Sequence, residues 1–192
     1  MPKSAKTKDP IQNTVLGLDL SLTSTGVILL DRDGGIVRQE TVRTKPNGNR
    51  PPDEINRLNG IVDRIFDGVN RKNVLLCAVE QVAFSRNMSS HSSLVALNYF
   101  VRKRLMELGI PFILISPTSA KKFASGDGKA QKDMMLLETY RRWGVAFDSS
   151  DLCDAYVMAR IGMITAGIAE PENAYQREII KKLSGQLLET SV

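Results

Sequence analysis

Five short apolar runs, each of strand length, constrain the fold of this chain more than any other feature. The first three follow one another closely, and the turn residues Asp33-Gly34-Gly35 separate the second from the third. The last two are almost wholly apolar, which is typical of strands buried on both faces. The runs are VLGLDLSL (15–22), GVILLD (26–31), GIVRQETV (35–42), VLLCAVE (74–80) and PFILIS (111–116). This order predicts an antiparallel meander followed by alternating helices and buried strands.

Segments with apolar residues at helical spacing connect and follow these runs. After the loop at 45–52, we expect Asp53 to cap a helix over 53–71. The other helices are predicted over 88–108, 117–124, 129–143 and 150–168, with an amphipathic helix beyond 171. Together these elements predict an α/β fold, a mixed five-stranded sheet with helices on both faces.

Length and composition favour one intracellular domain. With 192 residues and 42% hydrophobic content, the chain suits a single core. We place the domain at 13–169, after a disordered basic tail at 1–12 and before a helical C-terminal tail at 170–192. Cys77 and Cys153 lack the spacing of a disulfide framework or a zinc site, which indicates a reducing compartment. The sequence has no apolar run of membrane-spanning length and no secretory signal, so we expect a soluble protein without a membrane partner.

Positive charge is in slight excess and unevenly placed. The chain has 26 Lys and Arg residues against 21 Asp and Glu, and this net charge of +5 suits a polyanion but also many ordinary proteins. Lys121, Lys122, Lys129 and Lys132 crowd one stretch, and residues 102–104 form a second cluster. A solvated helix face accounts for the second cluster equally well.

Two carboxylates stand in apolar strand runs. Asp19 lies inside the first run, where an unpaired carboxylate is costly unless hydrogen-bond donors or a cation stabilise it. Local capping of the turn at 21–25 is the alternative role for Asp19. Glu80 repeats the feature, because it closes the fourth run and a rigid strand end presents it.

Two further carboxylates open the last core helix. Asp151 and Asp154 are three residues apart, so they lie on one helix face, which continues toward the core. Complementing the helix dipole is the alternative role for each. If both face the strand ends that carry Asp19 and Glu80, four negative charges converge and require divalent cations. Oxygen ligands select Mg²⁺ or Mn²⁺ over Zn²⁺.

Three motifs surround the four carboxylates: LGLDLSLTSTG (16–26), VEQVAF (79–84) and DLCDA (151–155). In this order they resemble the first, second and third motifs of the RuvC family of Holliday junction resolvases. The stretch KKFASGDGKAQK (121–132) resembles the family's basic segment, in which Lys132 matches the active-site lysine. The resemblance covers roughly residues 14–166. It implies a ribonuclease H-like fold and a homodimer that nicks two strands of a four-way DNA junction symmetrically.

On this resemblance the chain is a crossover-junction endodeoxyribonuclease that acts in recombination, repair or replication and leaves 5′-phosphate and 3′-hydroxyl ends. Asp19, Glu80, Asp151 and Asp154 would hold two Mg²⁺ or Mn²⁺ ions about 3.5 to 4 Å apart, one to activate water and one to stabilise the leaving oxygen. Lys132 would neutralise charge on the phosphoryl oxygens, with a plain phosphate contact as the alternative. The expected location is the cytoplasm of a bacterial or phage-infected cell, or an organelle.

Further residues are expected to contact DNA. They are Lys122, Lys129, Phe84, Arg86 and Asn87. Lys129 would bind a backbone phosphate together with the amides of 125–128. The last three follow the fourth strand, where Phe84 would stack on unpaired bases or else pack in the core. The family often has an aromatic residue directly after E-Q-V, whereas Ala83 follows here and Phe84 comes next.

Other functions fit parts of the sequence. Residues 17–31 also resemble the phosphate loop of sugar kinases and actin-like proteins, but those need two lobes and a second Asp-x-Gly loop that this length cannot hold. A catalytically inactive DNA-binding protein of the same fold is a second alternative. A flap-cutting, broader branched-DNA or RNA-processing nuclease is a third.

Overall fold

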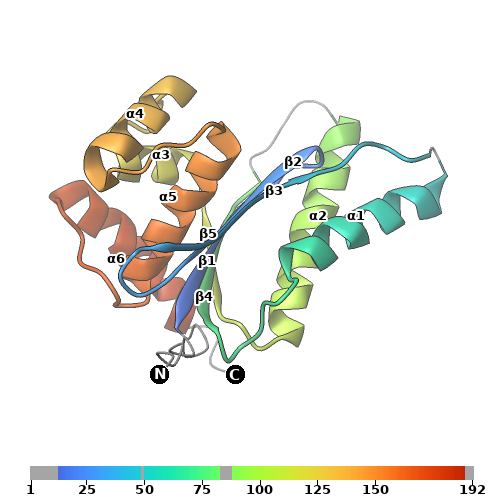
Figure 1. Cartoon of the computed structure of the whole chain (residues 1–192), viewed down its shortest axis with the longest axis horizontal. Helices are drawn as coiled ribbons and strands as arrows, with labels where there is room; N and C mark the ends of the chain where they lie inside the picture. Colours follow the sequence, from blue (N-terminus) through green and yellow to red (C-terminus); the bar gives the residue numbers. More distant parts are fainter. Residues whose placement is uncertain (1–12, 49, 83–87, 189–192) are drawn as a thin grey trace, which may run out of the picture.

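The computed structural model describes residues 13–48, 50–82 and 88–188 (Figure 1). The segment 1–12 and the candidate DNA contacts Phe84, Arg86 and Asn87 lie outside these residues. The strands are β1 (Thr14–Asp19), β2 (Ser24–Leu30), β3 (Ile36–Arg43), β4 (Val74–Glu80) and β5 (Phe112–Ile115). The helices are α1 (Pro51–Ile65), α2 (Met88–Glu107), α3 (Pro117–Ser125), α4 (Lys132–Trp143), α5 (Ser150–Thr165) and α6 (Ala174–Leu188). In the described ranges, no helix is long and apolar enough to cross a bilayer.

The strands form one mixed sheet in the order β3-β2-β1-β4-β5. Strand β2 pairs antiparallel with both β1 and β3, whereas β4 runs parallel to β1 and β5 runs parallel to β4. Helices α1 and α2 cover one face, and α5 lies against the other face with α3, α4 and α6 on the same side (Figure 1). The predicted mixed five-stranded sheet with helices on both faces is confirmed.

Alternate side chains of the central strands enter two hydrophobic cores. Leu16 of β1 belongs to the core beneath α1 and α2, whereas Val15 belongs to the core beneath α5. Since side chains alternate along a strand, Asp19 projects to the same face as Val15. In β4, Ala78 also belongs to the α5 core, so Glu80 projects there too. Strand periodicity therefore directs both carboxylates toward α5.

Helix α1 differs from its prediction at both ends. It begins at Pro51 rather than at 53, and Arg50 occupies the N-cap position. Asp53 is not the cap itself but stands in the first turn, where its carboxylate accepts hydrogen bonds from the Arg50 backbone N (3.2 Å) and guanidinium (2.8 Å). The Asp53 N–H in turn donates to the Arg50 backbone carbonyl (2.9 Å), so Asp53 stabilises the first turn without an N-cap side chain that accepts a hydrogen bond. The helix ends at Ile65 with Phe66 as its C-cap, and the chain then turns at Gly68, whose φ of +68° is left-handed.

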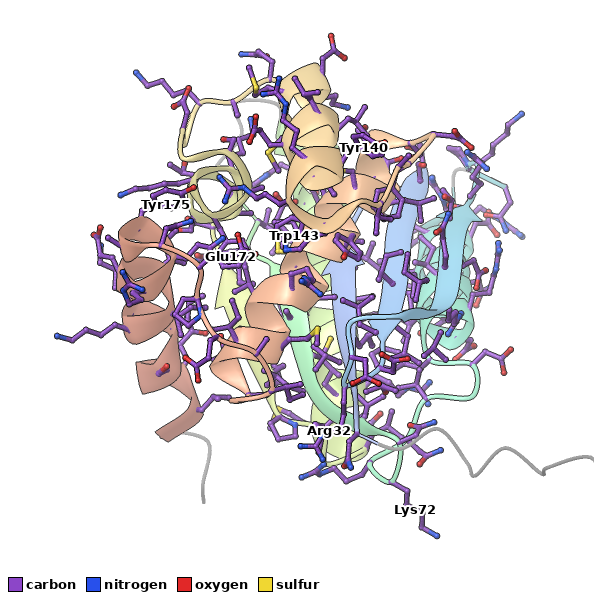
Figure 2. The ribbon with its side chains drawn as sticks, turned by 60° about the vertical axis from the view of Figure 1, so that its left-hand side comes forward. Arg32, Lys72, Tyr140, Trp143, Glu172 and Tyr175 are labelled. Carbon is purple, nitrogen blue, oxygen red and sulfur yellow. The ribbon has the colours of Figure 1, made fainter. Side chains whose placement is uncertain are left out.

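The C-terminal helix α6 packs on β5, α3 and α5. Gln186 accepts a hydrogen bond from the Leu114 N–H (2.8 Å) and donates one to the Leu114 carbonyl (3.0 Å). This side chain satisfies both backbone groups at the sheet edge that β5 forms. Before the helix, the Glu172 carboxylate accepts a hydrogen bond from Trp143 Nε1 of α4 (3.2 Å; Figure 2). These contacts fix the packing of α6, which the sequence left open.

Candidate active site

Asp19 and Glu80 end neighbouring parallel strands on the same face of the sheet. Leu18 of β1 lies opposite Val79 of β4, which brings the next residue of each strand side by side. Their carboxyl groups are close enough to share a hydrogen bond. Burial raises the pKa of both carboxyl groups, and the negative charge of Glu80 raises the pKa of Asp19 further. The pair therefore favours either a bound proton or a nearby cation.

Helix α5 adds the other two carboxylates. Burial raises the pKa of Asp154 to about 6, and the charge of Glu80 contributes to this increase. The charge of Asp151 raises the pKa of both Asp154 and Asp19. Carboxylates from β1, β4 and α5 thus act on one another, as the sequence predicted from their faces.

Two glycines allow α5 to approach the sheet this closely. A Cβ atom on Gly26 would lie 2.1 Å from the carbonyl oxygen of Asp151, and one on Gly17 would lie 2.1 Å from that of Ala155. Any side chain at these positions would push the helix away. Gly26 is directly opposite Asp19 in the β1–β2 ladder. The contact that sets the height of α5 above the sheet therefore also sets the separation of the carboxylates.

Serine hydroxyls orient Asp151. Ser24 donates a hydrogen bond of 2.5 Å to its carboxylate, and Ser150 lies 3.4 Å from the other carboxylate oxygen. Ser149 caps α5 by accepting a hydrogen bond from the Asp151 N–H (3.2 Å). Lys132 Nζ donates to the Ser150 hydroxyl at 3.2 Å, which ties α4 to this cluster. Sequence reasoning did not select Ser24, because the Ser/Thr-rich segment at 21–25 gives no sign of which hydroxyl faces α5.

Lys121 of α3 is a second side chain near the carboxylates that sequence reasoning did not single out. Its positive charge lowers the pKa of both Glu80 and Asp154, so it lies near the carboxylates. The positive charge of Lys132 also lowers the pKa of Asp154. In the sequence Lys121 was one of four clustered lysines, and only the orientation of α3 distinguishes it from the next residue, Lys122.

The other two lysines of the cluster have different surroundings. Lys122 forms an ion pair of 3.3 Å with Glu178 of α6. Lys129 is exposed, and its backbone N–H donates to the Asp127 side chain (2.9 Å) in the turn before α4. This turn is the reason that α4 begins at Lys132 rather than at 129. Contacts of Lys122 and Lys129 with DNA stay predictions.

The alternative capping role of Asp19 is less well supported than the shared site. Thr25 closes the turn at 21–25, accepting from the Ser21 N–H (3.1 Å) and donating to the Ser21 carbonyl (2.7 Å), so Asp19 is not needed as a cap. Among the described residues, no three His, Cys, Asp or Glu side chains already surround a single point. The four carboxylates nevertheless supply only oxygen ligands and repel one another, which suits Mg²⁺ or Mn²⁺.

Comparison with known proteins identifies the family. A family model described as "Crossover junction endodeoxyribonuclease RuvC" matches residues 15–159. The chain belongs to the RuvC family. Membership replaces the kinase or actin-like interpretation of residues 17–31. Helix α6 lies beyond the matched residues.

Individual RuvC proteins are distant relatives. RuvC of Chloroflexus aggregans is 28% identical over 126 residues, which are 62% of this chain and 73% of that protein. RuvC of Anaeromyxobacter sp. is 26% identical over 145 residues, 75% of this chain and 69% of that protein. The Thermus thermophilus RuvC structure, at 24% identity, has a TM-score of 0.64 over 76% of this chain and 90% of its own. A structure of T. thermophilus RuvC in complex with Holliday junction substrate, at 22% identity, also has a TM-score of 0.64. The match covers 77% of this chain and 90% of that chain. These structures show that the fold is shared.

Proposed function

We propose that this RuvC-family protein is a crossover-junction endodeoxyribonuclease that acts as a homodimer and nicks two strands of a four-way DNA junction. The supporting observation is the convergence of Asp19, Glu80, Asp151 and Asp154 from three elements of the fold. Such a cluster lowers the stability of the fold unless cations bind to it. A role in cleaving DNA at a phosphate would explain why the fold keeps four carboxylates that lower its stability.

The proposed cofactors are two Mg²⁺ or Mn²⁺ ions per site. Bound ions would supply an activated water and stabilise the leaving 3′-oxygen of the cleaved strand. The two strand-end carboxylates and the two α5 carboxylates would hold them. Ser24 fixes one oxygen of Asp151 and so orients this ligand.

The lysines would bind the substrate. Lys121 and Lys132 approach the carboxylates from α3 and α4 and would contact the non-bridging oxygens of the scissile phosphate, where charge develops. Lys129, which is exposed, would bind a backbone phosphate farther along the strand. The remaining predicted DNA contacts are Lys122, Phe84, Arg86 and Asn87.

Cleavage of end-labelled DNA with Mg²⁺ or Mn²⁺ tests the proposal. A four-way junction, a flap, a linear duplex and an RNA–DNA hybrid should be compared at equal concentration. We expect symmetric nicks in the junction, with ligatable 5′-phosphate ends. Equal cutting of flaps would indicate the broader branched-DNA nuclease instead. Junction binding without cleavage in either ion would indicate an inactive DNA-binding protein.

A further inference from the structure

Strand β3 carries an exposed arginine next to the active site. In the β2–β3 ladder, Arg43 lies opposite Ser24, whose hydroxyl donates to Asp151. Directly opposed residues of an antiparallel pair project to the same face. The Arg43 side chain therefore emerges on the face that carries the four carboxylates, one strand farther out than Ser24.

The backbone beside Arg43 is fixed by hydrogen bonds. The N–H of Thr44 donates to the Thr23 carbonyl at 3.2 Å, and the Thr44 hydroxyl donates to the Leu22 carbonyl at 2.6 Å. Arg57 of α1 donates to the Thr44 hydroxyl at 3.0 Å and also to the Leu22 carbonyl. The end of β3 is thus bonded to the loop that follows β1, so the position of Arg43 relative to the carboxylates is set.

The Arg43 guanidinium has no protein partner within the described part of the chain. By contrast, Arg38 of the same strand pairs with Glu40 at 2.6 Å, and Arg64 of α1 pairs with Glu40 at 2.7 Å. The exposed arginine therefore differs from its neighbours, whose charges are neutralised internally. An unpaired guanidinium on a fixed backbone position is available to an external anion, and its planar shape suits the oxygens of a phosphate.

We propose that Arg43 binds a backbone phosphate of the cleaved strand, within a few positions of the scissile phosphate. This inference rests on the proposed nuclease function. Neighbouring strands of a sheet lie about 4.8 Å apart, and one strand of B-DNA carries a phosphate about every 3.4 Å along its axis. Because β3 lies two strands, or about 10 Å, from β1, a DNA strand centred on the carboxylates and running across the sheet end would bring a phosphate within a few positions of the scissile one to β3.

The position of Arg43 complements that of Lys121. Lys121 follows β5, at one edge of the sheet, whereas Arg43 ends β3 at the other edge. The carboxylates lie between them, on β1, β4 and α5. Cations on both sides would hold the strand at two points and so position the scissile phosphate over the carboxylates.

Binding of chemically modified junctions tests this contact. Arg43→Gln and its parent should both carry Asp19→Asn, so that no strand is cut. Single neutral methylphosphonates would replace each of the nearest phosphates on either side of the cleavage position. We expect Arg43→Gln to weaken binding of the unmodified junction roughly tenfold and to reduce the salt slope by about one. At one position the methylphosphonate should weaken junction binding by the parent protein by a similar factor. The same methylphosphonate should not weaken binding by Arg43→Gln any further.

Arg32→Gln provides a control with the same change in charge. Arg32 is exposed in the turn after β2, at the end of the strands opposite Arg43. Figure 2 shows Arg32 and Lys72 at the end of the domain away from α4. We expect Arg32→Gln to bind the unmodified junction nearly as well as the parent. Because both arginines are exposed, both variants should melt at the temperature of the parent.

The possible results distinguish a local phosphate contact from long-range electrostatic attraction. Equal losses for Arg43→Gln and Arg32→Gln would overturn the proposal, because long-range attraction would then account for both. An Arg43→Gln protein that binds normally, or that loses affinity equally with every modified junction, would also overturn it. If the Asp19→Asn parent bound no junction at all, the proposed function itself would fail.

Discussion

Gly26 lies directly opposite Asp19 in the sheet, and the carbonyl oxygen of Asp151 sits 2.1 Å from the place where a Gly26 Cβ would be. The close contact between β2 and α5 therefore lies beside the place where the charges of the strand and helix carboxylates act on one another. Because protein interiors are packed without spare volume, a side chain at position 26 cannot be absorbed locally. The geometry of the site depends on a residue that has no functional group.

Gly26→Ala should impair both the site and the fold. The added methyl group would displace the start of α5 and move Asp151 and Asp154 away from the strand ends. We expect a loss of about 1 to 3 kcal/mol in the free energy of unfolding and a drop in junction cleavage of roughly tenfold or more. Denaturant unfolding and single-turnover cleavage below the melting transition measure the two effects. Gly60→Ala is the control, since no atom outside the neighbouring backbone of α1 lies within 4 Å of its Cβ position, and normal cleavage is expected.

Asp19→Asn and Glu80→Gln should separate cleavage from binding. A neutral amide binds a divalent ion poorly but leaves the phosphate contacts of the lysines intact and repels DNA less. We expect cleavage to fall more than roughly a hundredfold while junction affinity persists or increases. Asp67→Asn, at an exposed position after α1, should cleave normally. Wild-type nicking rates in either site variant would contradict the assignment.

The raised pKa of Asp154 predicts how pH affects the stability of the metal-free protein. Below about pH 3 the carboxyl group is protonated in both the folded and the unfolded state, so its raised pKa has no effect on stability there. As the pH rises toward 6, the unfolded chain loses this proton while the folded chain keeps it, because the folded pKa is about 6. The free energy of unfolding should therefore fall over this range and stay low above it, by about 3 kcal/mol at most from this group.

Asp154→Asn isolates this effect. In the presence of a chelator, the variant should gain stability relative to wild type between about pH 4.5 and pH 7.5. Millimolar Mg²⁺ or Mn²⁺ should raise the melting temperature of wild type at neutral pH, and the variant should respond less. A stability difference between the two proteins that stays constant with pH would show that Asp154 has an ordinary pKa.

The lysines should fall into two kinetic classes. Lys121→Met and Lys132→Met should lower the single-turnover rate at saturating DNA, each by roughly a hundredfold, with little change in affinity. Lys129→Met should instead weaken binding and reduce the salt slope by about one while cleaving normally when saturated. Salt titration of binding beside single-turnover cleavage separates these outcomes. Similar, salt-sensitive losses in all three variants would indicate general electrostatic support.

Much of the fold could be predicted from the sequence because it depends on local patterns. Apolar runs of strand length and helical spacing indicate their elements whatever their partners are. The same periodicities placed Asp19 within the first strand and Glu80 at the end of the fourth, and put Asp151 and Asp154 on one helix face. That β1 ends at Asp19 was decided only by the structure. The predicted start of α1 was wrong, because the two prolines form part of its first turn. Asp53 therefore stands three residues after the N-cap residue Arg50 and is not the cap itself.

Only the tertiary structure decided which neighbouring side chains join these carboxylates. The choice between Lys121 and Lys122 depends on how α3 is rotated against the sheet and α6. Ser24 and Asp151 are 127 positions apart, and their contact exists because Gly26 admits α5 at short distance. Such contacts follow from strand register and interhelical packing, which involve residues distant in the chain. Local periodicity sets the face on which a residue lies, whereas the packing of whole elements sets what it meets there.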